Sequence, residues 1–231
     1  MTRWTSNALG VALSAVAILA IAAFVGPRAA VSGRAEQPDG QLAQDRDLVL
    51  RGRYLIISHA CGDCHGGANN PAASGWLAGI TSPEQEFAIG ACAVTPGATP
   101  CFKTRPRNLT PDNTTGQVRF SERQIFNALR YGLRPGETPD VEITSTTPGQ
   151  GNFPAHPKYL APPMPWPSWR HMPDQDLWAI AAYLKRGLKP VSNKVEDSEG
   201  PPDFWVSEYT VEKIGRYPAP AFPTVNEKSP Q

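Results

Sequence analysis

The sequence predicts a small all-α domain, rich in loops and proline, that follows an N-terminal membrane helix. Apolar residues recur at helical spacing in three segments after residue 44, and no run typical of parallel strands occurs. Proline accounts for 25 of the 231 residues, about twice its average usage, which argues against a long regular helical bundle. The chain carries no charged side chain from Trp4 to Pro27, and this stretch predicts the membrane helix.

Residues 1–26 are expected to form a membrane anchor or a signal segment. The stretch from Ala8 to Val25 is almost wholly apolar and lies between Arg3 and Arg28. Its 18 residues just reach the length that spans a bilayer and exceed the apolar core of an ordinary signal peptide. We therefore expect an uncleaved anchor, with a cleaved signal peptide as the alternative. Either way the remaining chain is exported to the periplasmic side of the bacterial inner membrane.

The exported part divides into three regions. Residues 27–44 are small, polar and aperiodic and are predicted to be a linker. Residues 45–190 form the main domain, and residues 191–231 form a tail rich in proline and aromatic residues that lies against its own domain or against a partner. Within the main domain, helical patterns and capping signals predict helices over residues 45–61, 121–132 and 173–187.

The segment Cys61-Gly62-Asp63-Cys64-His65 is a C-x-x-C-H motif, the attachment signature of c-type haem. Two thiols at this spacing reach the two vinyl groups on one edge of a porphyrin. The histidine that follows comes from the same helical turn and can place its imidazole under the iron. The motif therefore predicts one covalent haem c, with thioether bonds at Cys61 and Cys64 and with His65 as the proximal ligand.

Two other interpretations of these cysteines were weighed. A thioredoxin-like redox motif requires a preceding strand, whereas a helical pattern precedes this one. A zinc site would need Cys92 and Cys101 as its remaining ligands, but their spacing is unusual for zinc and an oxidising compartment favours disulfides. We therefore expect a disulfide between Cys92 and Cys101, with two free buried thiols as the alternative.

The distal side of the iron needs a second ligand, and Met164 is the strongest candidate. It lies in Pro162-Pro163-Met164-Pro165-Trp166, where the prolines stiffen the backbone and hold one side chain out. Packing of Met164 in a loop is the alternative. Met172, His156 and His171 are weaker candidates for the same role.

Several motifs occur in an order that resembles the small monohaem c-type cytochromes. They are Cys61–His65, N-L-T-P-D at 108–112, A-L-R-Y-G at 128–132, P-P-M-P-W at 162–166 and D-L-W-A-I-A-A-Y-L at 176–184. The resemblance is strongest to the cytochrome domains or subunits of membrane-bound periplasmic alcohol and sugar-acid dehydrogenases. It implies an all-α fold in which the first and last helices cross near Gly52 and Tyr183, with the haem in the cleft and Met164 as the distal ligand. Residues 84–104 depart from the family and look like an insertion.

Ligation by His65 and Met164 would leave no open position on the iron, so the chain is expected to be an electron carrier and not an enzyme. A haem enzyme or gas sensor with an open distal site, and a relay subunit of a larger dehydrogenase complex, are the alternatives. Trp76, Trp166 and Trp169 are expected to shield the haem from water. The expected partners are a periplasmic dehydrogenase, a quinol-linked complex or a terminal oxidase. The net charge of +1 argues against nucleic-acid binding.

Overall fold

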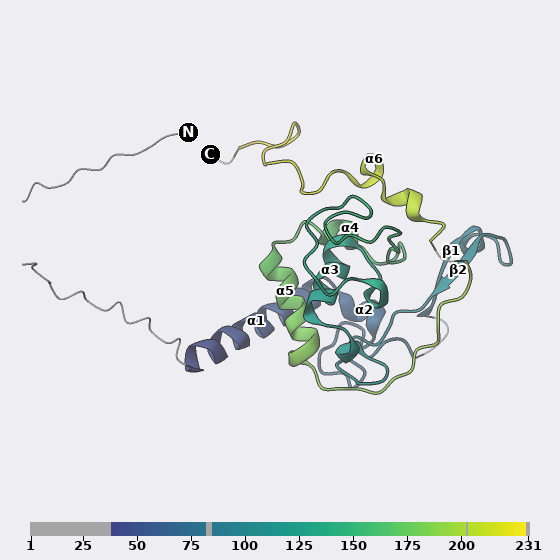
Figure 1. Cartoon of the computed structure of the whole chain (residues 1–231). Coiled ribbons are helices and arrows are strands. Elements are labelled where there is room, and N and C mark those ends of the chain that lie inside the picture. The colour runs from purple at the N-terminus through teal and green to yellow at the C-terminus, as the bar shows by residue number, and fades with distance from the viewer. Residues whose placement is uncertain (1–37, 82–84, 202, 230–231) are drawn as a thin grey trace, which may run out of the picture. The chain divides into compact units, whose positions relative to one another are not determined.

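Helices α1 (Pro38–Ser58) and α5 (Asp174–Ala182) pack across each other in the computed structural model, which describes residues 38–81, 85–201 and 203–229 (Figure 1). A Cβ atom at Gly52 would lie 1.9 Å from the carbonyl oxygen of Ala179 and 2.7 Å from the Cβ of Tyr183. The crossing therefore occurs where the family resemblance places it, because only glycine leaves room for the two backbones. A π-helical turn, η5 (Tyr183–Gly187), continues α5.

Helix α3 (Glu122–Tyr131) packs on α5 and completes the core with Ile125, Phe126 and Leu129. Its start carries a capping box, in which Ser121 Oγ accepts from the Gln124 backbone N–H at 3.0 Å and Gln124 Oε1 accepts from the Ser121 N–H at 3.1 Å. The predicted helix over 121–132 thus agrees with the structure to within one residue at each end. The remaining helical elements are short: α2 (Cys61–His65), η3 (Gln117–Arg119), η4 (Pro135–Glu137), α4 (Trp166–Trp169), η6 (Val206–Tyr209) and α6 (Val211–Ile214).

Helix α1 begins before the predicted start at Asp45, so residues 38–44 of the predicted linker are helical. The side chains of residues 41–44 are all exposed, and this part of the helix therefore shows no apolar periodicity that a sequence pattern could reveal. The helix therefore begins about two turns before the start that the sequence pattern predicts.

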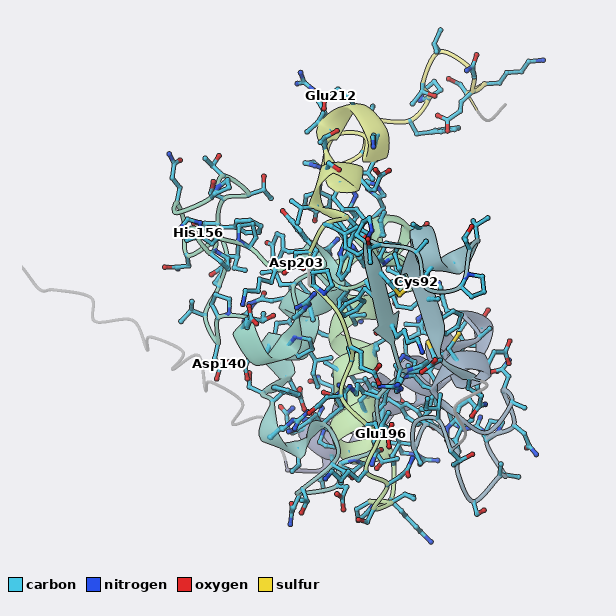
Figure 2. The ribbon with its side chains drawn as sticks, turned by 90° about the vertical axis from the view of Figure 1, so that its right-hand side faces the viewer. Cys92, Asp140, His156, Glu196, Asp203 and Glu212 are labelled. Carbon is cyan, nitrogen blue, oxygen red and sulfur yellow. A yellow bond between two sulfur atoms is a disulfide. The ribbon has the colours of Figure 1, made fainter. Side chains whose placement is uncertain are left out.

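A small antiparallel sheet departs from the all-α prediction. Strand β1 (Phe87–Gly90) pairs with β2 (Cys101–Thr104), with Phe87 opposite Thr104 and Gly90 opposite Cys101. A short 3₁₀ turn, η2 (Ala91–Ala93), follows β1, and a disulfide joins Cys92 to Cys101 at this end of the hairpin (Figure 2). The sheet lies within residues 84–104, the predicted insertion. Strands of four residues are too short to give a clear alternation of apolar and polar residues.

The C-terminal segment Val191–Tyr217, which we call the strap, lies against its own domain. Asn193 Nδ2 donates to the carbonyls of Ala78 and Ile80 at 2.8 and 3.0 Å. Glu199 forms an isolated antiparallel bridge with Lys103 of β2. Trp205 is only 2% exposed and packs on Phe102, with 4.8 Å between the ring centroids. Figure 2 shows the strap passing from Glu196 by way of Asp203 to Glu212.

The predicted membrane segment over residues 1–26 lies outside the described residues. Among the helices that the structure does describe, none combines the length and the apolar character that crossing a bilayer requires.

Candidate functional site

One cavity of about 450 Å³ brings together side chains that are far apart in the sequence. Cys61, Cys64 and His65 of α2 line it from one part of the chain, and Met164 lines it from the loop before α4. Its walls are mainly apolar and include Ile56, Leu109, Ile125, Leu129, Leu160, Ile180 and Leu184. We call it the central cavity. The four residues that the sequence singled out for haem binding therefore line one largely apolar cavity.

The imidazole of His65 is held in one defined orientation. Its Nδ1 lies 2.8 Å from the carbonyl oxygen of Arg107, and because a carbonyl only accepts, Nδ1 must be the donor. The other ring nitrogen, Nε2, then carries a free lone pair. Burial lowers the pKa of His65, although the bond to the carbonyl opposes this effect, and the ring is favoured in its neutral form. A neutral imidazole oriented by a backbone carbonyl is the usual state of a metal-ligating histidine.

Backbone hydrogen bonds hold the end of α2 against the loop that follows it. The His65 carbonyl accepts from the N–H of Gly79 at 2.7 Å, and the Gly66 carbonyl accepts from Leu77 at 3.0 Å. Gly66 has φ +100°, and a Cβ there would lie 2.7 Å from the Gly79 carbonyl oxygen, so this close approach requires glycine. The loop that follows the C-x-x-C-H motif thus folds back along the motif and holds it in place.

Asn108 anchors the segment that follows Arg107, and this gives the N-L-T-P-D motif a structural role. Its side chain is 2% exposed, and its Nδ2 donates to the Val191 carbonyl at 2.7 Å and to Thr115 Oγ1 at 2.9 Å. Its Oδ1 accepts from the backbone N–H of Thr110 at 2.9 Å. The buried amide is therefore fully hydrogen-bonded, and its bond to Val191 ties the segment beside the central cavity to the start of the strap.

Cys61 and Cys64 are free thiols and are not bonded to each other. Burial raises the pKa of Cys61 to about 12 and also raises the pKa of Cys64. A reactive dithiol has a lowered thiol pKa, so this site does not resemble a thioredoxin-like centre. The disulfide between Cys92 and Cys101 occupies the two cysteines that a zinc site would need. Neither of the alternative interpretations of the motif fits this arrangement.

The loop that carries Met164 is tightly turned. The Met164 N–H donates to the Ala161 carbonyl, and the Trp166 N–H donates to the Met164 carbonyl, both at 2.9 Å. Both Met164 and Met172 pack against the core, but Met164 is the one methionine in the described part of the chain that lines the central cavity. His156 and His171 are exposed and do not line it, and Figure 2 shows His156 on an outer loop.

Comparison with known proteins gives an independent view of the chain. No protein-family model matches it. It is 30% identical over 155 residues to the gluconate 2-dehydrogenase cytochrome c subunit of Pantoea cypripedii, covering 67% of this chain and 26% of that subunit. It is 30% identical over 159 residues to the cytochrome c subunit of alcohol dehydrogenase (quinone) from Komagataeibacter europaeus, covering 68% of this chain and 25% of that subunit. It is 25% identical over 146 residues to the fructose dehydrogenase cytochrome subunit of Gluconobacter japonicus, covering 63% of this chain and 22% of that subunit.

The chain belongs to the same family as these dehydrogenase cytochrome c subunits. It spans about a quarter of the length of these curated relatives. Membership of this family implies a covalently bound haem c and a part in electron transfer.

In this cytochrome c homologue, two of the three tryptophans expected beside the haem lie elsewhere. Trp169 lines the central cavity, but Trp76 and Trp166 do not. The Trp76 ring packs behind α2, where a Cβ at Gly62 would lie 2.2 Å from it, and its Nε1 donates to Tyr183 Oη at 3.0 Å. Trp166 lines a second pocket, described below. The expectation was wrong for both because a sequence pattern does not reveal which side of a loop or helix a buried ring faces.

The sequence interpretation also missed two arginines of the cytochrome c homologue. Arg105 and Arg107 line the central cavity, and both are bound by the strap. Arg105 Nη2 pairs with Glu199 at 2.7 Å and with Glu86 at 2.8 Å, while Arg107 Nη1 donates to the Val195 carbonyl at 2.9 Å. Their position just before the N-L-T-P-D motif is visible in the sequence, but the partners that orient them lie about 90 residues further on.

The residues present fit a haem c. Two thiols lie on the same short helix as an imidazole with a free Nε2, and a thioether sulfur lines the same cavity. The apolar walls suit the porphyrin ring, and Arg105 and Arg107 line the same cavity. Every class of group that a covalent haem requires is therefore present in one cavity.

Proposed function

We propose that this cytochrome c homologue carries single electrons through one covalent haem, attached by thioethers at Cys61 and Cys64 and ligated by His65 and Met164. The observation that supports this proposal is that all four side chains line the central cavity although nearly 100 residues separate His65 from Met164. When bound, the haem supplies an iron that alternates between two oxidation states. The protein's own residues determine where it sits and how its potential is tuned.

Each side chain has a defined task in this proposal. The Arg107 carbonyl holds the Nδ1–H of His65, which directs Nε2 at the metal and makes it a better donor. The soft thioether of Met164 favours the reduced iron and raises the potential. The apolar walls exclude water, and this also favours the less charged, reduced centre. With both His65 and Met164 as ligands, the iron would have no open position for a substrate, and the chain would be a carrier and not an enzyme.

The partners follow from the relatives' names, which are those of cytochrome subunits of gluconate, alcohol and fructose dehydrogenases. We propose that a periplasmic dehydrogenase donates electrons and that a quinol-linked complex or a terminal oxidase accepts them. Function as a relay subunit within a dehydrogenase complex is the close variant of this proposal. The protein would act on the periplasmic side of the bacterial inner membrane, with residues 1–26 as its anchor.

Covalent attachment is tested on protein expressed with export to the periplasm. A pyridine haemochrome spectrum should show haem c, and acid–acetone extraction should leave the colour on the protein. The Cys61→Ala/Cys64→Ala variant should lose its haem to the extraction. If the wild-type haem washes out, or if none is bound, the proposal fails.

Axial ligation is tested by a matched pair of methionine variants. The oxidised wild-type protein should show the weak red charge-transfer band of a Met–Fe(III) bond, Met164→Ala should lose it, and Met172→Ala should keep it. Loss in Met172→Ala alone would make Met172 the ligand, and persistence in both variants would exclude a methionine.

The reduced wild-type protein should also leave its spectrum unchanged under carbon monoxide. A spectral shift under carbon monoxide would instead indicate an open distal site, as in a haem enzyme or gas sensor.

A further inference from the structure

A second pocket, of about 400 Å³, lies between α3, α4 and the strap, and we call it the aromatic pocket. Trp166 and Tyr159 line it as a stacked pair, with 5.8 Å between ring centroids and 4° between ring planes. Tyr209 of the strap meets Trp166 edge-on, with centroids 4.9 Å apart. A volume of this size is in the range of small-molecule sites, and aromatic walls suit a flat apolar ligand.

Two buried arginines also line the aromatic pocket, and their charges are balanced differently. Arg130 is 4% exposed and its Nη2 pairs with Asp174. Arg170 is 6% exposed, and all its hydrogen-bond acceptors are backbone carbonyls, among them those of Ile214 and Gly215 at 2.6 and 2.8 Å. No carboxylate within the described residues forms an ion pair with Arg170.

An uncompensated buried cation is costly, because neutral carbonyls replace only part of its hydration. Burial accordingly lowers the pKa of Arg170. Because Arg170 lines the pocket, an anionic ligand there would lie beside the guanidinium and supply the missing counter-charge. The strap therefore closes a pocket whose electrostatics favour a negative group and whose walls favour a ring.

We propose that the aromatic pocket binds a small aromatic carboxylate, with its ring against the Tyr159, Trp166 and Tyr209 side and its carboxylate paired with Arg170. An inorganic anion would leave the aromatic walls unfilled, and a neutral aromatic molecule would leave the guanidinium without its counter-ion. A carboxylate also matches the planar fork of a guanidinium, which gives a charge-assisted hydrogen bond.

The aromatic pocket is separate from the central cavity, but the two share one wall. Residues 159–166 run between them, with Tyr159 and Trp166 lining the aromatic pocket and with Leu160 and Met164 lining the central cavity. The proposal does not depend on haem ligation, because none of its contacts involves the residues assigned to the haem.

The test is isothermal titration calorimetry of the haem-loaded wild-type protein with 2-naphthoate. The matched neutral probe is 2-naphthamide, which has the same ring and nearly the same shape but no charge. We expect 2-naphthoate to bind with a stoichiometry of about one and about tenfold or more tightly than the amide. Absence of saturable naphthoate binding, or equal affinities for the two probes, would overturn the proposal.

Two variants locate the site, and each has a control. Arg170→Gln should reduce the affinity for naphthoate to that of the amide, while Arg123→Gln, an α3 arginine over Trp178 that lines neither pocket, should not. Because Arg170 also holds the strap, a second pair of variants is made at Thr146, an exposed residue that lines the pocket. Thr146→Trp should block naphthoate binding and Thr146→Ala should preserve it. Binding that survives Thr146→Trp unchanged would contradict the assignment to this pocket.

Discussion

At position 52 the contact between α1 and α5 leaves space for a hydrogen atom and nothing larger. Gly52→Ala would place a methyl group 1.9 Å from the Ala179 carbonyl oxygen, so the helices must move apart. We expect a loss of about 1–3 kcal/mol in the free energy of unfolding, as for other overpacked cores. Urea denaturation measures it, with Gly75→Ala as the control because nothing lies within 4 Å of a Cβ at that position. If Gly52→Ala and Gly75→Ala were equally stable, the two helices would be able to move apart without a loss in the free energy of unfolding.

Single residues also show what a sequence can reveal about a site. Cys61, Cys64 and His65 are predictable because covalent haem chemistry fixes their spacing within one helical turn. Met164 was the strongest of several candidates from the sequence, and in the structure it lines the central cavity whereas Met172 does not. Arg105 and Arg107 were not predictable, because their place beside the cavity depends on acceptors in the strap that no local pattern connects to them.

At the scale of elements, an ion pair joins α1 and α5 beside their crossing. Arg51 Nε and Nη2 donate to the two carboxylate oxygens of Asp176, both at 2.9 Å. The hydrogen bond from Arg51 is the main cause that lowers the pKa of Asp176. A lowered carboxyl pKa stabilises the fold at pH values above the unfolded value, about 3.9, and this stabilisation is lost as the pH falls through the lower folded value.

We therefore expect a double-mutant cycle of Arg51→Gln and Asp176→Asn to give a small favourable coupling at pH 7, since Arg51 is half exposed and water screens the pair. The coupling should shrink toward zero as the pH is lowered below about 4. Arg53 on the same helix forms no ion pair within the described residues, so Arg53→Gln serves as the control. A coupling that does not change with pH would show that the pair contributes nothing through charge.

Helix ends explain which elements the sequence predicted. The helix at 122–131 has a capping box at its start and Gly132 with φ +69° at its end, and both signals are local. The start of α1 shows no apolar periodicity, because its side chains at 41–44 are exposed. The β1–β2 hairpin has no local signal either, because its stability comes from neighbours distant in sequence. The hairpin packs Phe102 on Trp205 and pairs Lys103 with Glu199, and both partners lie in the strap.

At the scale of the whole molecule, Trp205 holds the strap to the hairpin. Its ring is 2% exposed, but its Nε1 has no hydrogen-bond partner, so the contribution of Trp205 is packing. We expect Trp205→Ala to lower the free energy of unfolding by about 3–5 kcal/mol and to expose Arg105 to trypsin. Trp205→Phe should retain most of the stability. If Trp205→Ala is as stable and as resistant to trypsin as the wild type, the strap is not a structural part of the domain.

The disulfide between Cys92 and Cys101 closes a ten-residue loop in the same region. The chain-entropy relation gives about 2.7 kcal/mol for a loop of this length, as an upper figure. The Cys92→Ser/Cys101→Ser pair should unfold at a lower temperature while its haem spectrum stays that of the wild type, because neither cysteine lines the central cavity. Alkylation of the unfolded, unreduced wild-type protein should find no free thiol at these two positions. Labelling of both Cys92 and Cys101 would show that the disulfide does not form.

The strap has a consequence for the order in which the protein matures. Residues 61–65 are synthesised well before Val195, Asp197 and Glu199, which fix Arg105 and Arg107 at the edge of the central cavity. A porphyrin delivered to the thiols during export therefore meets a nascent chain whose cavity still lacks its final edge. Maturation is then expected to run in one direction, with attachment of the cofactor first and packing of the strap against the cavity edge second.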